Sequence, residues 1–344
     1  MEQVLSARFY APKQPLTLES VPVPEMHDDD VLVDVKAATI CHSDLHTIAG
    51  RQIPAMAPIT LGHEASGIVA AKGKSVTSVE VGDRVGVDYV LSCGRCQFCL
   101  RGKDNLCDNF TVMSANTEGS WKEKVVVPAR HVHKLPANVG FPEGAMLNCA
   151  VMTAYHSVKY AQISPGVSVL VYGLGGVGLS LLKWTKIAGA GDIIAVDLED
   201  EKLRIARREG ATATVNPRDG NPVEQIRKLT GGGVDIGFEV IGKVESERNV
   251  ISSVKKGGQA VLVGMCWDPV PVNVVNDLQV PEVKIMSPQD HLKAEIPEVL
   301  RLIETGRFVF GDAVTHKFPL ESANEAVYVL QNRIGNPGRV VLEP

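Results

Sequence analysis

Apolar and polar positions divide the chain into regions with two kinds of periodicity. Up to about residue 90 the pattern is β-rich. Alternating apolar and polar residues predict a half-buried strand at 31–37, and short apolar runs between glycine turns predict strands at 65–70 and 83–89. The aspartates at 28–30 interrupt the apolar pattern, and we interpret them as a solvated turn rather than a metal site.

The pattern changes near residue 150, where apolar β-branched runs begin to alternate with helical segments. This alternation predicts a parallel sheet that helices cover on both faces. The expected strands are 167–172, 192–196, 234–240 and 260–264, the expected helices between them are 176–187, 200–209, 223–229 and 244–254, and helices at 293–305 and 320–332 and a strand at 339–342 are expected to follow.

Length and composition are those of an ordinary globular protein. The 344 residues suffice for two domains, with 44% hydrophobic and 22% charged residues. A net charge of −5 and a pI near 6.0 argue against a nucleic-acid partner. The N-terminus has no basic stretch followed by an apolar one, and no apolar run approaches the roughly 18 residues of a transmembrane helix. We therefore expect neither a signal peptide nor a membrane partner.

Four cysteines within a short stretch give the densest chemical signal: Cys93, Cys96, Cys99 and Cys107. Four thiolates so closely spaced can fill every position of a tetrahedral Zn²⁺, which makes a structural site. The alternative is disulfides, which belong to oxidising compartments and small scaffolds. The chain has seven cysteines, an odd number, and a reducing cytoplasm with metal-bound thiolates explains them most simply.

A glycine-rich loop indicates a dinucleotide site. Gly173, Gly175 and Gly178 form Gly-x-Gly-x-x-Gly between an expected strand and an expected helix. The first glycine permits a tight turn, the second lets the backbone approach a pyrophosphate, and the third lets the helix pack closely on the sheet. The pyrophosphate would then lie at a helix N-terminus, where free N–H groups favour negative charge.

Asp197 ends the next expected strand, and its position completes the motif. A carboxylate there can accept hydrogen bonds from the adenosine ribose hydroxyls and would repel a 2′-phosphate. The residues that follow, 198–200, include no arginine that could receive such a phosphate. We infer NAD rather than NADP, with the alternative that Asp197 only caps a strand or helix.

A second metal site is indicated by Cys41, His63 and Cys149. One histidine and two cysteines supply three ligands and leave the fourth tetrahedral position for water or substrate, as in a catalytic zinc site. Alone, each cysteine could equally be a small buried hydrophobe.

Together these motifs resemble the zinc-dependent alcohol dehydrogenases of the medium-chain dehydrogenase/reductase superfamily, over nearly the whole chain. The resemblance is carried by the motifs at 41–44 and 62–67, the four cysteines, Cys149 and the glycine loop. It implies an α/β fold with two domains. A GroES-like β-rich catalytic domain would comprise 1–150 and 288–344, with a structural zinc lobe at about 92–108. A Rossmann domain with a doubly wound parallel sheet would comprise 151–287.

The resemblance also implies roles for residues around the reactive metal. Cys41, His63 and Cys149 would hold the catalytic zinc. Glu64 would be an acid that can approach the metal and help exchange its water. Asp44 would hold the liganding imidazole, because such a partner fixes the tautomer and orientation of a metal-bound histidine.

A proton relay and two binding sets are implied as well. Ser43 would take the alcohol proton, and the nicotinamide ribose would pass it to His46 and so to solvent. Thr153 would lie beside the nicotinamide, and His42 and Arg339 near the pyrophosphate. The implied cofactor-binding set is His42, Thr153, Gly173, Gly175, Gly176, Val177, Gly178, Asp197, Lys202 and Arg339, and the implied substrate pocket is Tyr89, Trp121 and Met265. For Trp121 and Met265, ordinary core packing is an equal alternative.

The implied activity is reversible hydride transfer between a small alcohol and NAD, with two Zn²⁺ and NAD(H) per chain and a homotetramer favoured over a dimer. The bulky, mainly apolar pocket candidates suggest a medium-sized or aromatic alcohol. A related zinc dehydrogenase or reductase acting on a polyol, an aldehyde or a CoA-linked alcohol is the main alternative. Polyol and threonine dehydrogenases usually carry a glutamate where Cys149 stands, which favours the alcohol branch.

Two alternatives belong to other classes of protein. An NAD(H)-binding sensor would keep the fold without catalysis, but the intact ligand set, together with Ser43 and His46, argues against it. A zinc finger that binds nucleic acid would explain the four cysteines alone and leaves the glycine loop unexplained.

Overall fold

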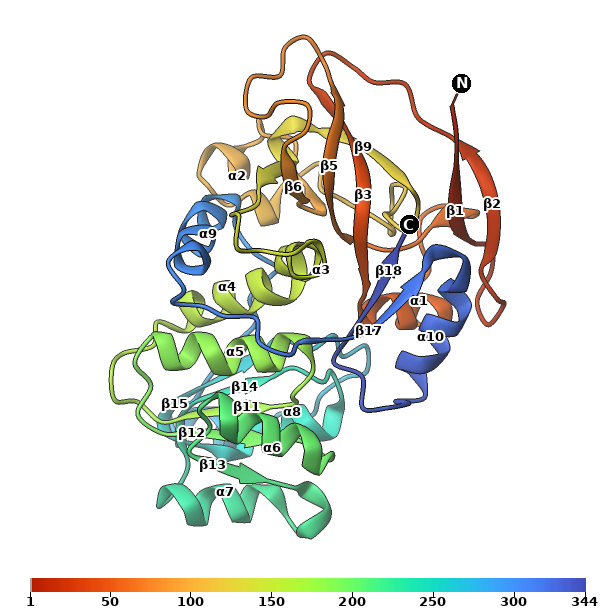
Figure 1. Cartoon of the computed structure of the whole chain (residues 1–344). Coiled ribbons are helices and arrows are strands. Elements are labelled where there is room, and N and C mark those ends of the chain that lie inside the picture. The colour runs from red at the N-terminus through yellow and green to blue at the C-terminus, as the bar shows by residue number, and fades with distance from the viewer. Residues whose placement is uncertain (1) are drawn as a thin grey trace. The chain divides into compact units, whose positions relative to one another are not determined.

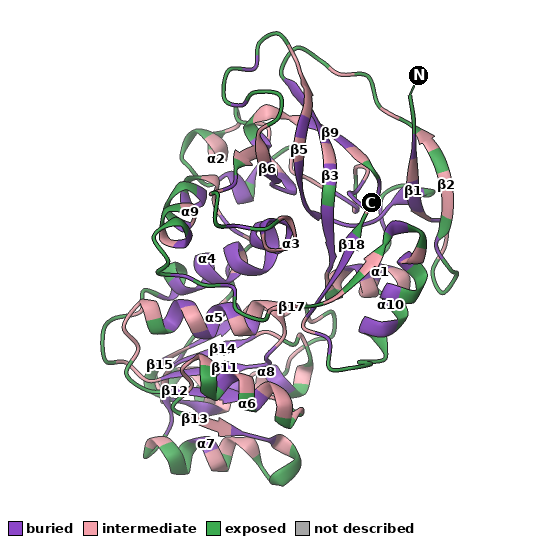
Figure 2. Cartoon of the chain, viewed as in Figure 1, coloured by how far each residue is buried: buried purple, intermediate pink, exposed green. Residues whose placement is uncertain are grey.

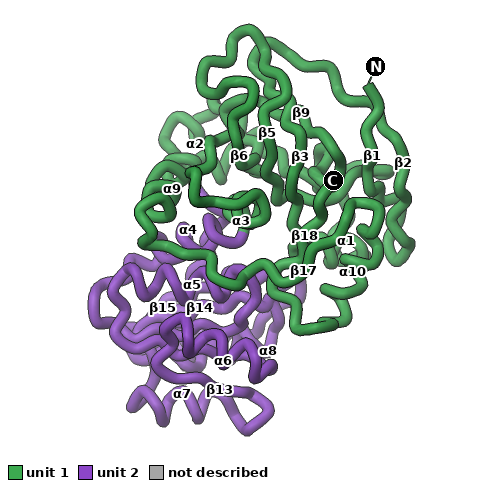
Figure 3. Tube along the Cα trace, in the orientation of Figure 1, with its two compact units in different colours: residues 1–149, 292–344 green, residues 150–291 purple. Residues whose placement is uncertain are grey.

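The computed structural model describes residues 2–344, and the chain forms two compact units (Figure 3). Unit 1 combines residues up to Cys149 with Leu292–Pro344, and unit 2 is Ala150–His291. The expected domain boundaries were 150/151 and 287/288, so the second division lies four residues later than expected. In the part of the chain that the structure describes, no helix is long and apolar enough to cross a membrane.

Unit 1 is β-rich, as Figure 1 shows. Its largest sheet has the order β10-β6-β5-β3-β18-β17, with β9 also paired to β3, and smaller sheets have the orders β2-β1-β4 and β7-β8. The strands are β1 Gln3–Phe9, β2 Thr17–Pro22, β3 Asp30–Ile40, β4 Ile59–Thr60, β5 Glu64–Lys72, β6 Arg84–Val87, β7 Val90–Leu91, β8 Thr111–Val112, β9 Lys124–Pro128, β10 Val132–Lys134, β17 Val314–Pro319 and β18 Arg339–Glu343. The helices are α1 His42–Ile48, α2 Gln97–Leu100, η1 Asp104–Leu106, η2 Ala129–His131, α3 Phe141–Met146, η6 Lys293–Glu295, α9 Ile296–Glu304, η7 Leu320–Ser322 and α10 Ala323–Gln331, and η3, Leu147–Val151, runs on from α3.

Unit 2 contains a parallel sheet of order β13-β12-β11-β14-β15-β16. This order, with the first strand of the unit in the centre, is that of the doubly wound dinucleotide-binding fold, so the expected fold class is confirmed. The central strands β11 and β12 are buried along their length (Figure 2). The strands are β11 Val169–Tyr172, β12 Ile193–Val196, β13 Ala213–Val215, β14 Val234–Glu239, β15 Val254–Leu262 and β16 Lys284–Met286. The helices are α4 Met152–Ala161, α5 Gly176–Ile187, α6 Asp200–Glu209, η4 Pro217–Asp219, α7 Pro222–Thr230, α8 Val244–Ser253 and η5 Val274–Gln279.

The structure corrects several expected elements. β15 begins at Val254 rather than 260, because its first half contains two exposed lysines and two glycines that hide the strand pattern. β17 was missed, since its alternate residues are only half-buried. The helix α1 interrupts the region expected to be β-rich. The turn at 28–30 is not fully solvated: Asp30 is buried, starts β3, and its carboxylate accepts a hydrogen bond from the His27 amide.

Candidate functional site

Strand register brings the predicted metal ligands together. β3 pairs antiparallel with both β5 and β18, and Thr39 lies opposite Glu64 while Ile40 lies opposite Val340. Cys41 follows the last residue of β3, and His63 precedes the first residue of β5. The sheet therefore places two distant ligands at one edge.

The donor atoms of Cys41, His63, Glu64 and Cys149 all lie within 4.8 Å of one another. His63, Glu64 and Cys149 are buried, and Cys41 is half-buried. Among the described residues, this group and the four-cysteine group are the two clusters able to hold a metal ion.

Asp44 is buried and joins the start of α1 to the histidine ligand. Its Oδ2 accepts the Cys41 backbone N–H at 2.9 Å, which caps the helix, and its Oδ1 lies 3.3 Å from His63 Nδ1. With Nδ1 committed to the carboxylate, the Nε2 of His63 is left for a metal ion.

Cys149 lies on a π-helical turn, Leu147–Val151, between α3 and α4. Such turns are uncommon and occur frequently at functional sites. The neighbouring Asn148 is buried, and its Nδ2 donates to the carbonyl oxygens of Ala65 at 3.1 Å and Gly144 at 3.0 Å. Asn148 thus ties the turn that carries Cys149 to the strand that follows His63.

Arg339 is buried at the start of β18 and faces the cluster. Its Nη2 lies 3.0 Å from Glu64 Oε1, and its Nη1 donates to the Ile40 carbonyl oxygen at 3.4 Å. Its guanidinium thus contacts one member of the metal cluster, Glu64, and the residue before Cys41. The contact with a pyrophosphate stays a prediction.

The pKa values of the clustered side chains are shifted by their neighbours. A hydrogen bond to Cys149 is the largest cause that holds the pKa of Cys41 well below its usual value, and the same bond raises the pKa of Cys149. Burial raises the pKa of Glu64 to about 7, against the opposing charge of Arg339.

Burial opposes the charge on His63, yet the neighbouring Asp44 and Cys41 raise the pKa of its imidazole well above the usual value. The two thiols and the imidazole thus compete for protons in a buried space. Soft sulfur donors with one imidazole suit Zn²⁺, which would displace those protons. The residues present fit the metal.

Ser43 and His46 lie one turn apart on α1, on the same helix face. Ser43 Oγ is buried and has no hydrogen-bond partner within residues 2–344. His46 is half-buried, and burial, followed by the charge of Arg51, lowers the pKa of its imidazole. The relay roles themselves stay predictions.

The four-cysteine lobe also has the geometry of a metal site. Its Sγ atoms lie 3.5 Å apart for Cys96 and Cys99, 3.8 Å for Cys96 and Cys107, and 4.0 Å for Cys93 and Cys99. Tetrahedral zinc with Zn–S bonds of about 2.3 Å requires sulfurs about 3.8 Å apart. No disulfide joins any of the described cysteines, so the four sulfurs remain available to a metal ion.

The three glycines of the loop differ in how strongly the fold requires a residue without a side chain. Gly173 has a φ of +106°, which favours glycine. A Cβ on Gly178 would lie 1.9 Å from the Gly173 carbonyl oxygen, so only glycine fits. A Cβ on Gly175 would meet no heavy atom within 4 Å. The fold does not need glycine there, whereas a closely approaching ligand would. Gly175 is the N-cap residue directly before α5, and no side chain caps that helix.

Asp197 does more than the sequence indicated. Its Oδ2 accepts the Leu174 N–H at 2.8 Å and its Oδ1 accepts the Glu199 N–H at 3.0 Å, which ties the glycine loop to the turn after β12. Asp197 therefore has a structural role in this turn, and a contact with ribose stays a prediction. Lys202 lies half-buried on α6 and Thr153 half-buried on α4, both in unit 2, and His42 is exposed on α1 in unit 1.

The three predicted pocket residues differ in exposure. The Tyr89 ring is 4.9 Å from the His63 ring, beside the metal cluster. Trp121 is 0% exposed, and a Cβ on Gly62 would lie 2.1 Å from its Cδ1. Trp121 therefore packs under the loop that carries His63, as the core-packing alternative expects, and its place in a substrate pocket stays a prediction. Met265 is exposed in unit 2.

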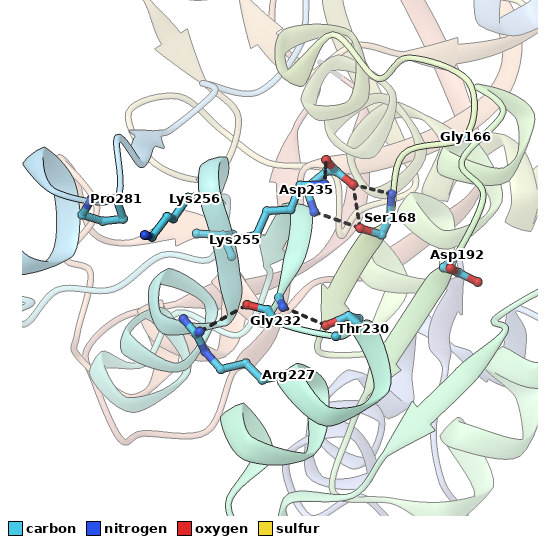
Figure 4. Close-up of a pocket in the computed structure, with 13 residues that line it drawn as sticks. Gly166, Ser168, Asp192, Arg227, Thr230, Gly232, Asp235, Lys255, Lys256 and Pro281 are labelled. Atoms are coloured by element: carbon cyan, nitrogen blue, oxygen red, sulfur yellow. Dashed lines mark hydrogen bonds and ion pairs between the residues drawn. The ribbon is translucent and has the colours of Figure 1, made fainter.

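A polar depression of about 740 Å³ lies in unit 2, at the amino ends of β11, β14 and β15 (Figure 4). Its charged groups are largely paired. Asp235 accepts hydrogen bonds from the amide and hydroxyl of Ser168 and pairs with Lys255, and Arg227 donates to the carbonyl oxygens of Ser252 and Gly232. This network fastens the sheet at the end opposite the glycine loop.

Sequence reasoning missed two buried polar residues near the candidate sites. Asn148 was passed over although it adjoins Cys149. Glu239, at the end of β14, is 0% exposed and accepts the backbone N–H groups of Ile241 and Gly242. A charged residue directly after an apolar strand was the available signal for Glu239.

Comparison with known proteins adds to this geometry. Residues 27–137 match the alcohol dehydrogenase GroES-like domain and residues 176–305 match the zinc-binding dehydrogenase family. An alcohol dehydrogenase of Geobacillus stearothermophilus is 33% identical over 334 residues, which cover 96% of this chain and 97% of that protein. An L-threonine 3-dehydrogenase of Bacillus velezensis is 33% identical over 335 residues, 95% of each chain. The structure of alcohol dehydrogenase TADH from Thermus sp. ATN1 has a TM-score of 0.91 and 29% identity, and covers 98% of this chain and 99% of its own.

The two units and the metal cluster thus define a zinc-binding oxidoreductase. The chain belongs to the zinc-containing alcohol dehydrogenase family of the medium-chain dehydrogenase/reductase superfamily.

Replacing Asp44 with alanine should weaken metal binding at the Cys41 cluster by about 10–100-fold, because His63 would lose the partner that orients it. Chelator competition followed by metal analysis measures this, with zinc in the four-cysteine lobe as internal reference. Asp28→Ala removes an exposed carboxylate and serves as control. Unchanged zinc retention in Asp44→Ala would contradict the role.

Two alanine substitutions in the glycine loop should separate folding from ligand binding. Gly178→Ala should destabilise unit 2 by about 1–3 kcal/mol, because the clash with the Gly173 carbonyl exceeds the helix-propensity gain of about 1 kcal/mol. Gly175→Ala should leave the denaturation midpoint unchanged, since its φ of −74° and open surroundings accept a methyl group. Equal midpoints for the two variants in urea would refute this reading.

Proposed function

We propose that this chain is an NAD(H)-dependent zinc alcohol dehydrogenase that interconverts a small alcohol and its aldehyde or ketone. The observation that carries the proposal is the convergence of the Cys41, His63 and Cys149 donor atoms beside Glu64. The Geobacillus stearothermophilus alcohol dehydrogenase and the matched families support it. Relatives named threonine and sorbitol dehydrogenases leave polyols and amino alcohols as the alternative substrates.

Cys41, His63 and Cys149 would hold the catalytic metal. Zinc there supplies Lewis acidity, which lowers the pKa of an alcohol oxygen, and NAD supplies the hydride acceptor. Asp44 keeps the His63 ring in one tautomer through its contact with Nδ1. Glu64 and Arg339 balance one another's charge behind the ligands.

Proton removal would use α1. Ser43 Oγ, buried and without a described partner, accepts the alcohol proton. His46 lies one turn further along the same helix face, and its half-buried imidazole releases the proton toward solvent. A buried hydroxyl without a partner is costly in a purely structural role, which supports its use in the reaction.

The glycine loop would hold the cofactor. The N-terminus of α5, with the open surroundings of Gly175, offers N–H groups to a pyrophosphate. Asp197 would accept hydrogen bonds from the ribose. We propose a homotetramer, by analogy with the shorter microbial members, and a cytoplasmic location, which the seven free thiols support.

Three cysteine variants test the two-metal assignment. The wild type should contain two zinc ions per chain. Cys41→Ser should retain one and lose NAD-dependent alcohol oxidation, measured across primary, secondary, aromatic and polyol substrates. Cys96→Ser should also retain one and lose thermal stability more than intrinsic rate. Cys266→Ser, outside both clusters, should keep two zinc ions and full activity. Near-normal turnover in Cys41→Ser would overturn the proposal.

Cofactor choice needs its own test, because a similar structure from Sinorhizobium meliloti 1021 was solved bound to NADP. Asp197→Ala should lower the ratio of kcat/KM for NAD to that for NADP by about 10–100-fold, the range expected for a lost charged hydrogen bond and a removed repulsion. Asp192→Ala, before the other end of β12, is the matched control. A purely structural Asp197 would reduce both values equally and leave the ratio unchanged.

A further inference from the structure

The four-cysteine lobe touches the segment by which the chain re-enters unit 1. We define this return segment as Leu292–Glu295: unit 1 resumes at Leu292, and η6, Lys293–Glu295, continues directly into α9. The sequence predicts that the lobe is a structural zinc site, which holds its own loop together. Its contacts within the described chain point to another task.

The first contact is a helix cap supplied by the lobe. The carboxylate of Asp104, only 8% exposed, accepts the Lys293 backbone N–H at 3.2 Å to Oδ2 and 3.4 Å to Oδ1. Lys293 is the first residue of the helical stretch that runs to Glu304. A carboxylate at this position satisfies a free N–H and stabilises the helix dipole.

The second contact uses the side chain of the same lysine. Lys293 Nζ lies 3.2 Å from Nε2 of the buried His131 and can donate to it; the Ser92 carbonyl oxygen lies 3.2 Å from the same nitrogen and is its alternative partner in the other tautomer. Ser92 directly precedes Cys93. Lys293 is therefore held by its backbone from Asp104 in the lobe and by its side chain from His131 on η2.

The position of Asp104 depends on the cysteines around it. It lies between Cys99 and Cys107, and the Cys107 amide donates to its carbonyl oxygen at 3.2 Å. The lobe's own helices, α2 and η1, have four and three residues. Helices this short have too few internal hydrogen bonds to persist alone. A metal on the four sulfurs would fix the loop that carries Asp104.

We propose that the four-cysteine lobe is a metal-dependent clamp on the return segment, with Asp104 as the residue that positions Lys293. The lobe would thereby hold the first turn of the helix that begins where the chain comes back from unit 2. The clamp rests on the zinc proposed for the lobe, whereas the Asp104 contact can be tested without that assumption.

Amide hydrogen exchange of the full-length protein tests the contact. In Asp104→Ala, the amides of the return segment and the first turn of α9 should exchange about tenfold faster or more, the loss expected for one charge-assisted hydrogen bond. Asp108→Ala removes an exposed carboxylate from the same lobe and should exchange like the wild type. Peptides covering β11, in unit 2, report whether a variant is globally unfolded.

Metal analysis accompanies each sample and separates this inference from the proposed function. Asp104→Ala should keep the zinc content of the wild type. Cys99→Ser should lose the lobe's zinc and show the same faster exchange in the return segment, and the double variant should add little. If Asp104→Ala fails to fold, Asp104→Asn, which keeps one acceptor oxygen, should show a smaller rise at the same amides.

Two results would overturn the clamp: return-segment exchange in Asp104→Ala equal to that in Asp108→Ala, or unchanged exchange in Cys99→Ser after its lobe has lost the metal. A wild type without zinc in the lobe would instead refute the two-metal assignment, and the clamp with it, while the Asp104 contact would still be measured.

Discussion

A buried ion pair between Glu64 and Arg339 is the constraint on which unit 1 depends. The two side chains are 0% and 5% exposed, and they come from strands on either side of β3. Removing one partner of a buried pair leaves an uncompensated charge, at a cost of about 3–5 kcal/mol. The pair therefore requires the C-terminal strand β18 to add to the sheet of the N-terminal segment. It also places a fixed positive charge beside thiols that must be deprotonated to bind metal.

Three neighbouring side chains, Asp44, Asn148 and Trp121, hold the metal cluster at that edge of the sheet. Asp44 caps α1 and orients His63. Asn148 anchors the π-helical turn that carries Cys149. Trp121 fills the space that the missing side chain of Gly62 leaves beside His63. These hydrogen bonds and packing contacts hold the ligand residues in place through the protein's own groups.

In unit 2, Gly178 and Gly175 of the glycine loop differ in what their surroundings allow. Gly178 is required because the backbone of its own loop passes too close for a side chain, whereas a Cβ on Gly175 would meet no heavy atom within 4 Å. Asp197 ties the loop in place through both carboxylate oxygens and is itself half-buried. At the amino ends of the strands, Asp235 pairs with Lys255, and Arg227 donates to backbone carbonyl oxygens. Because these charged groups already have partners within the fold, we do not assign a binding site to the polar depression there.

The sequence by itself determined the fold class, the glycine loop, the four-cysteine set and most elements of unit 2, because these depend on local periodicity and on residue types at short spacing. It indicated Cys41, His63 and Cys149 only through their residue types and the family resemblance, since these residues are far apart in the chain. It did not reveal β17 or the first half of β15, whose residues are too exposed or too polar to form a pattern. Nor could it show that Trp121 is sealed in the core, that Arg339 turns toward Glu64, or that Asp104 meets Lys293. Those facts depend on strand register and on contacts between residues far apart in the chain, which only the tertiary structure decides.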